Sequence, residues 1–340
     1  MGVIVQLKIL NEVPSKLYTC KVTEVHEVLG GPTIIHLKGK LTKPIFLSAL
    51  LHGNETTSFD VLSQVLNKYK NEELPRDLII FIGNTLAAVE GMRHLPGQPD
   101  YNRIWQIGEG DTPEHEMAAK VTAYVKEHKP FASIDIHNNT GKNPLYGCVN
   151  STEPEFMALA SHFGSNTVYF TEPHNVQSMG FCTFCTAITI EAGLPSEPRG
   201  VVAAFEFFDK IFHMDKITMN PERSEFEIYH TIARLKVDER ARIDFEDQGD
   251  GDSDLSFIPE FDSQNFKVVK KQTHLGHAKN LKCIRVEDNN GRDLTNDFFK
   301  IEGSALVTNR TFIPSMFTKD IYVMKEDCLG YIMEVIIPTK

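Results

Sequence analysis

The chain has few cysteines and no long apolar run, and these absences exclude several classes of protein. Its 340 residues include six cysteines, too few and too scattered for a disulfide framework in a chain of this size. We therefore expect reduced, mostly buried thiols. No apolar run is long enough to span a bilayer, and the first residues lack the basic and apolar segments of a secretion signal. We expect a cytoplasmic protein without a membrane partner.

Positive charge is also scarce. The chain has 35 Lys plus Arg against 46 Asp plus Glu, a formal net charge of −11, and no basic run gathers along it. Nucleic acid is therefore not an expected partner. The hydrophobic share of 41% and the charged share of 24% are typical of a globular protein with an ample core. A chain of this length fits one large domain and a smaller one.

The order of apolar runs predicts an α/β domain. Residues 45–51 form a nearly continuous apolar run, of the kind found in strands that are buried on both faces, and residues 77–84 are the next predicted strand. Shorter patterns predict strands at 17–22, 33–37, 132–137, 167–170 and 186–191, and helices at about 59–69, 113–129 and 200–214. This alternation predicts a mixed sheet flanked by helices on both faces.

The pattern changes after about residue 236. Helical periodicity stops there, and short β-like runs broken by turn residues continue to residue 340. The acidic stretch 244–254 lacks the glycine and the closing glutamate of a calcium loop, which favours a solvated inter-domain loop. We therefore predict two domains, residues 1–236 and a smaller β-rich domain over residues 237–340.

Candidate metal ligands stand at the ends of two predicted strands. His52 and Glu55 follow the strand at 45–51, and His137 ends the strand at 132–137. In open α/β sheets, residues at the carboxyl ends of the strands converge on one crevice. Two histidines and one glutamate leave a zinc ion with an open coordination position, as in catalytic sites. Each residue alone is a weak signal, so the prediction depends on their joint placement.

Two further carboxylates have candidate roles at the same edge of the sheet. Asp135 lies two residues before His137, so both side chains point to the same side and Asp135 can accept the second N–H of a ligating imidazole. Glu191 ends an apolar strand, and a carboxylate beside a metal ion can take a proton from water and return it to a leaving nitrogen. A turn carboxylate at 135 and a core ion pair at 191 are the alternatives.

Four ordered motifs resemble one enzyme family. They are His52-Gly53-Asn54-Glu55, Tyr101-Asn102-Arg103, residues 135–140 and residues 189–193. In this order they are similar to the succinylglutamate desuccinylase/aspartoacylase branch of the zinc carboxypeptidase superfamily. The resemblance covers about the first two thirds of the chain and implies a zinc-carboxypeptidase-like α/β fold. It also implies one zinc ion per chain, with His52, Glu55 and His137 as ligands and Glu191 as the residue that activates water.

The resemblance implies substrate contacts as well. Asn102 and Arg103 match a pair that holds the carboxylate of the substrate's amino-acid part, for which a guanidinium fork is well suited. Arg93 matches an arginine that helps to polarise the scissile carbonyl. The loop from Arg93 to Asn102 is longer than in aspartoacylases, so an ordinary surface arginine is the alternative.

The segment before Glu191 departs from the family pattern. Residues 177–185 contain neither the tyrosine nor the arginine with which aspartoacylases recognise an acidic side chain. Acetylaspartate is therefore not the expected substrate. Phe181 and Phe184 would suit a less polar group, although at least one of them is expected to pack in the core.

The sequence therefore predicts a zinc-dependent hydrolase that cleaves an amide bond next to a carboxylate-bearing amino acid, as an N-acyl amino acid deacylase or a desuccinylase does. A metallocarboxypeptidase that acts on short peptides is one alternative, and a non-catalytic zinc-containing protein that binds carboxylates is another. A serine hydrolase is disfavoured because no Gly-x-Ser-x-Gly motif is present. The expected partner is a small-molecule substrate, an N-acyl amino acid or a short peptide. The sequence leaves open whether the chain forms a homo-oligomer.

Overall fold

The chain divides into two units, which are described separately. The computed structural model describes residues 5–195, 197–222, 227–246 and 252–336. The first unit is Met1–Asn138 with Leu145–Phe226, and the second is Asn139–Pro144 with Glu227–Lys340. This division does not test where an independently folding domain ends, so the boundary between residues 236 and 237 stays a prediction.

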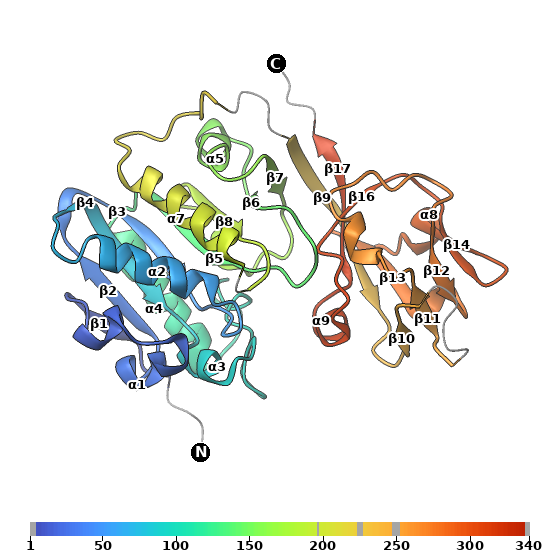
Figure 1. The fold of residues 1–340 in the computed structure, drawn as a ribbon, viewed down its shortest axis with the longest axis horizontal. Helices are drawn as coiled ribbons and strands as arrows, with labels where there is room; N and C mark the ends of the chain where they lie inside the picture. Colours follow the sequence, from blue (N-terminus) through green and yellow to red (C-terminus); the bar gives the residue numbers. More distant parts are fainter. Residues whose placement is uncertain (1–4, 196, 223–226, 247–251, 337–340) are drawn as a thin grey trace. The chain divides into compact units, whose positions relative to one another are not determined.

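A mixed sheet forms the centre of the first unit (Figure 1). Its strands follow the order β1-β2-β4-β3-β5-β8-β6-β7. Their bounds are β1 Lys8–Leu10, β2 Thr33–Leu37, β3 Gly39–Ala49, β4 Leu74–Ile82, β5 Ala132–His137, β6 Tyr146–Val149, β7 Asn166–Tyr169 and β8 Ala187–Glu191. β3, β4, β5 and β8 run parallel, whereas β2 and β6 are antiparallel to β4 and β8. The carboxyl ends of β3, β5 and β8 therefore meet at one edge of the sheet.

Helices flank this sheet. They are α1 Val25–Leu29, α2 Thr57–Lys68, α3 Thr85–Glu90, α4 Pro113–Glu127, α5 Pro154–Ala160, α6 Gln177–Phe181 and α7 Pro198–Phe212. α2 and α7 lie side by side over the sheet in Figure 1. The apolar side chains of the central strands, such as Leu47, Ile134 and Ile188, are fully buried, because helices and neighbouring strands exclude water from them.

The strand expected over residues 17–22 is not formed. Ser15–Tyr18 and Val22–Glu24 are short 3-10 helices instead. Pro14 starts the first of these turns, and the N–H groups of Leu17 and Cys20 donate to the carbonyls of Pro14 and Lys16 at 2.8 and 3.0 Å. These local bonds, rather than a sheet ladder, satisfy the backbone, so the β-like composition of this run misled the prediction.

The second unit is rich in β structure, as predicted. One group of strands has the order β9-β17-β16, with β13 also paired to β9, and a separate sheet has the order β10-β11-β12-β15-β14. The bounds are β9 Glu227–Val237, β10 Ile243–Asp244, β11 Leu255–Phe257, β12 His274–Ala278, β13 Ile284–Asp288, β14 Phe299–Glu302, β15 Ala305–Thr308, β16 Ile313–Ser315 and β17 Gly330–Ile336. Two short helices, α8 Thr295–Phe298 and α9 Ile321–Glu326, interrupt the strands, which the sequence pattern did not predict.

Two further sequence predictions concern the acidic stretch 244–254 and membrane-spanning segments. Residues 247–251 of the predicted inter-domain loop lie outside the described residues, Asp244 belongs to β10, and residues 252–254 directly precede β11. Within the described part of the chain, no helix is both long and apolar enough to cross a bilayer.

Phe181 belongs to the core and does not supply an exposed apolar contact. Its side chain is 0% exposed, and its ring centroid lies 4.9 Å from that of Phe46 and 5.7 Å from that of Trp105. We expect Phe181→Ala to lower the free energy of unfolding by about 3–5 kcal/mol in urea titrations, since it removes buried area and leaves a cavity. Ile107→Ala is the control, because Ile107 is 69% exposed. Equal, small losses in both variants would show that Phe181 does not support the core.

Candidate metal centre

The turn after β3 has a backbone that brings two candidate metal ligands, His52 and Glu55, together. Leu50 has a φ of 56°, which is unusual for a residue with a β-carbon and is found mainly where structure around it enforces it. Its N–H donates to Ser58 Oγ at 3.0 Å, and its carbonyl accepts from the N–H of Asn84 at 2.7 Å. A side chain at Gly53 would collide with the backbone of α3 at Ala87, so only glycine lets the turn lie so close to that helix.

Three potential ligand atoms meet at the end of this turn. His52 Nδ1 lies 2.8 Å from Glu55 Oε1, and His137 Nδ1 lies 2.8 Å from Glu55 Oε2. The two Nδ1 atoms are 3.2 Å apart. Ligands of a tetrahedral zinc ion at 2.0–2.1 Å are separated by about 3.3 Å, so this spacing is close to that of three ligands around one ion. His52, Glu55 and His137 are all buried and form a group that could hold a metal.

The contact between the two histidines also fits a bound cation. If both Nδ1 atoms carried protons, two N–H donors would face each other at 3.2 Å. The outer nitrogens have acceptors of their own, since His52 Nε2 lies 2.9 Å from Asp100 Oδ1 and His137 Nε2 lies 2.7 Å from Asp135 Oδ2. Such carboxylates keep the proton on the outer nitrogen and leave the inner lone pair available to a metal. The residues present therefore fit a divalent ion.

Asp135 lies beside His137, as the spacing of the two residues predicts. It is fully buried and also accepts a hydrogen bond from Ser48 Oγ. Asp100 has the matching role at His52 and was not predicted. It lies in an irregular loop without strand periodicity, and its only sequence signal is its position two residues before Asn102.

The strand register aligns Glu191 with these groups. His137 of β5 pairs with Glu191 of β8, and Asp135 pairs with Thr189 on the same face. Paired residues of neighbouring strands project to the same side of a sheet. Glu191 therefore lies on the face that carries His137, a candidate metal ligand.

Glu55 and Asp100 remain ionised in this buried setting. Burial would raise the pKa of Glu55, but the imidazoles of His52 and His137 hold it well below its usual range. Burial also opposes ionisation of Asp100, yet Arg93 and His52 hold the pKa of Asp100 well below its usual range. Both carboxylates therefore carry negative charge at neutral pH, which favours a cation between the histidines.

Glu191 is in the opposite electrostatic situation. Its side chain is 8% exposed, and its Oε2 has no hydrogen-bond partner among the described residues. Burial raises the pKa of Glu191 to about 7, with His137 opposing and Glu55 adding to the shift. A carboxyl group with this pKa can both accept and donate a proton near neutral pH.

The predicted substrate residues lie next to the histidines. Asn102 is buried, accepts from the N–H of Gln177 at 2.9 Å, and has its Nδ2 3.4 Å from His137 Nε2. Arg103 is partly exposed, and its Nη1 donates to the carbonyl of Asn102 at 2.9 Å. The contact with Arg103 therefore joins it to Asn102, whose own side chain is held by Gln177 and lies beside His137.

Arg93 contacts two carboxylates of the site. Its Nε lies 3.0 Å from Asp100 Oδ2, and its Nη1 lies 3.4 Å from Glu55 Oε1. Its side chain is 19% exposed. These contacts place Arg93 beside the candidate metal ligand Glu55 and do not fit the alternative of an ordinary surface arginine.

Comparison with known proteins agrees with the resemblance of the motifs. Residues 42–198 match the family described as succinylglutamate desuccinylase/aspartoacylase catalytic domain. No curated protein sequence matches the chain. The matched segment contains all of the predicted site residues, from His52 to Glu191.

Solved structures of this family have the same fold. A succinylglutamate desuccinylase/aspartoacylase from Rhodobacter sphaeroides aligns with a TM-score of 0.60 and 13% identity, over 90% of this chain and 89% of that chain. Succinylglutamate desuccinylase from Chromobacterium violaceum has a TM-score of 0.56 and 14% identity, over 88% and 87%. Murine aminoacylase 3 has a TM-score of 0.53 and 14% identity, over 87% and 96%. These likenesses confirm the predicted fold class.

The contact between Asp135 and His137 leads to a test of metal affinity. We expect Asp135→Asn to weaken zinc binding by about 10- to 100-fold, because the outer N–H of His137 loses its charged acceptor. Competition with a chromophoric chelator measures the affinity. Asp111→Asn is the control, since Asp111 is exposed on a loop. Unchanged affinity in Asp135→Asn would mean that this carboxylate does not tune the ligand.

Proposed function

We propose that this chain, of which residues 42–198 match the succinylglutamate desuccinylase/aspartoacylase catalytic domain, is a zinc-dependent hydrolase that removes the acyl group from an N-acyl amino acid. The observation that carries the proposal is the convergence of His52, Glu55 and His137 within hydrogen-bond distance of one another, with Glu191 paired to His137 across the sheet. A zinc ion bound there would polarise the scissile carbonyl and make water a stronger acid.

Glu191 is the general base and acid of this proposal. It takes a proton from the attacking water and later returns it to the nitrogen of the leaving amino acid. Its pKa of about 7 suits both steps, because the group can be ionised before attack and protonated after it. Its Oε2, without a partner among the described residues, is available for that proton.

The neighbouring polar side chains bind and orient the substrate. Arg103 binds the carboxylate of the amino-acid part, and Asn102 fixes the loop that presents it. Arg93 lies close to Glu55 and thus beside the zinc site of this proposal. There its positive charge stabilises the negative charge that develops on the carbonyl oxygen of the substrate during attack. This arrangement calls for a substrate with a carboxylate next to the amide bond.

A metallocarboxypeptidase would use the same groups on a short peptide. The similar structures are described as a desuccinylase and an aminoacylase, which favours an acyl amino acid. A non-catalytic carboxylate-binding protein has no need of a base at Glu191. Release of free amine from a panel of N-acyl amino acids and dipeptides decides among the three, since only the proposed function gives turnover confined to the acyl amino acids.

Glu191→Gln is expected to lower kcat by about 10²- to 10⁴-fold, because glutamine cannot accept the proton of water. The variant should retain zinc, since Glu191 is not among the three grouped ligands. Steady-state kinetics and metal analysis of the same sample measure both quantities. Glu206→Gln, on the exposed side of α7, is the control. A near-normal rate in Glu191→Gln would identify a different base.

The rate should fall in acid. The carboxylate of Glu191 must be ionised to accept a proton, so kcat/KM rises with pH as this group loses its own proton. Its pKa is about 7, and a bound cation lowers that value further. We therefore expect an acidic limb in the profile of kcat/KM at or below pH 7. A limb that is unchanged in Glu191→Gln would belong to another group.

Arg103→Ala should lower kcat/KM by about 10- to 100-fold, which corresponds to the loss of a charged hydrogen bond worth about 1.5–3 kcal/mol. Arg240→Ala, at an exposed position of the second unit, is the control. The substrate is the best acyl amino acid of the panel. The same measurement is made with the carboxamide of this substrate, which lacks the carboxylate charge. If Arg103→Ala lowers kcat/KM by the same factor for the carboxamide and for the acid, Arg103 does not bind that carboxylate.

A further inference from the structure

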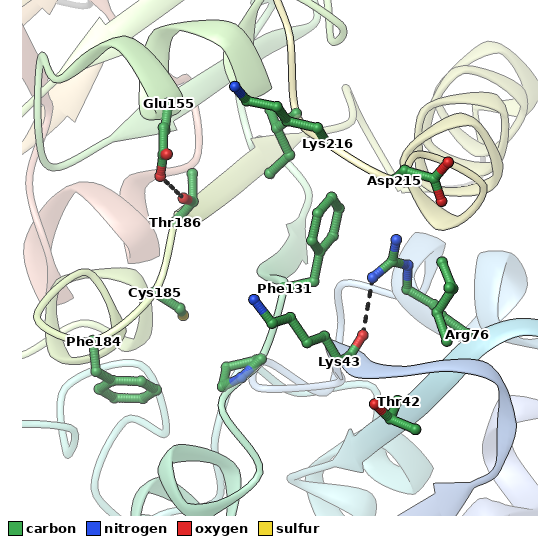
Figure 2. A pocket seen from close by; sticks show the side chains of 13 residues that line it. Thr42, Lys43, Arg76, Phe131, Glu155, Phe184, Cys185, Thr186, Asp215 and Lys216 are labelled. Carbon is green, nitrogen blue, oxygen red and sulfur yellow. Dashed lines mark hydrogen bonds between the residues drawn. The ribbon is translucent and has the colours of Figure 1, made fainter.

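A cavity, drawn in Figure 2, lies at the strand ends opposite to those that carry the candidate metal ligands. It has a volume of about 660 Å³ and is lined by the first halves of β3 and β4 and by the segments directly before β5 and β8. The candidate metal ligands lie at the other ends of β3 and β5. Because β5 spans Ala132–His137, about 16 Å of strand separates the two sites.

Positive charges surround this cavity. Lys43, Arg76 and Lys216 line it, and no carboxylate of a described residue forms an ion pair with any of the three. Glu155 and Asp215 also line it, so the positive charges exceed the negative ones by one. Glu155 is engaged by the hydroxyl of Thr186 at 3.5 Å, as Figure 2 shows. Because no described carboxylate forms an ion pair with Lys43 or Lys216, both ammonium groups can bind an anion.

Arg76 gives the wall of the cavity a fixed positive charge. Its side chain is 1% exposed and donates to the backbone carbonyls of Lys43 at 2.9 Å, Phe212 at 3.2 Å and Met214. These acceptors are neutral and satisfy the N–H groups, while the carboxylate of Asp215, which also lines the cavity, offsets part of the charge of Arg76. A buried cation in a low-dielectric wall raises the electrostatic potential of the space beside it.

An aromatic ring stands beside these cations. The guanidinium of Arg76 lies 3.8 Å from the ring centroid of Phe131, which is only partly buried. In the view of Figure 2, Phe131 lies between the side chains of Lys43 and Lys216. Phe184 adds a second partly exposed ring to the lining. The cavity thus combines cations with apolar surface.

We propose that this cavity is a binding site for a small organic anion, in which Lys43 and Lys216 bind a carboxylate or phosphate group and Phe131 contacts the apolar body. Its volume lies within the range of about 300–1,000 Å³ that is usual for small-molecule sites. The site is separate from the metal centre and does not depend on the proposed hydrolysis.

Calorimetric titration of the full chain with benzoate and with phenyl phosphate tests this proposal. Both probes have a phenyl ring, and they differ in the anionic group, which is a carboxylate in benzoate and a phosphate in phenyl phosphate. We expect at least one probe to bind with one site per chain, equally well before and after removal of metal by a chelator. Loss of binding on metal removal would assign the probe to the metal centre and overturn the proposal.

Charge variants locate the site. Lys43→Glu with Lys216→Glu should weaken binding at least tenfold, and Lys43→Gln or Lys216→Gln alone should weaken it less. Lys282→Glu, an exposed position in the second unit, should leave it unchanged. All substituted lysines are exposed, so thermal unfolding should stay close to that of the wild type. Equal affinity in all variants, or no binding of either probe, would contradict the proposal.

Discussion

The proximity of three buried ligand atoms is the constraint on which the rest of the site depends. His52 Nδ1, His137 Nδ1 and the carboxylate of Glu55 lie 2.8–3.2 Å apart where little water can separate them. One cation shared by all three would satisfy their lone pairs at once. The surrounding groups serve this arrangement, since Asp100 and Asp135 hold the outer nitrogens of the two imidazoles. The backbone of Leu50 is strained, with a φ of 56°, in the turn that brings His52 and Glu55 together.

Two glutamates in the same buried region have opposite electrostatic environments. The imidazoles keep the pKa of Glu55 low, whereas burial and the charge of Glu55 raise that of Glu191. Glu55 is thereby suited to bind a cation, and Glu191 is suited to exchange protons. Environments that push the pKa values of two titratable groups apart are a common basis for dividing catalytic roles between them. The parallel register of β5 and β8 maintains the division, because it fixes Glu191 beside His137.

Much of the fold and of the candidate site could be predicted from the sequence, because both depend on strand ends. Buried parallel strands are visible as apolar runs, and polar residues at their carboxyl ends, such as His137 and Glu191, stand out against them. Asp100 escaped prediction because its contact with His52 is made by an irregular loop far away in sequence. Residues 17–22 were predicted wrongly because local hydrogen bonds after Pro14 outweighed β propensity. The cavity at Lys43 was not visible either, since it brings together segments that share no sequence pattern.

X-ray absorption spectroscopy of the purified, zinc-loaded protein, combined with its metal content, tests the central claim most directly. The account predicts one zinc ion per chain in a shell of nitrogen and oxygen ligands with two imidazoles, and loss of that ion in His137→Ala. A sulfur-containing shell, or a zinc content that His137→Ala leaves unchanged, would contradict it.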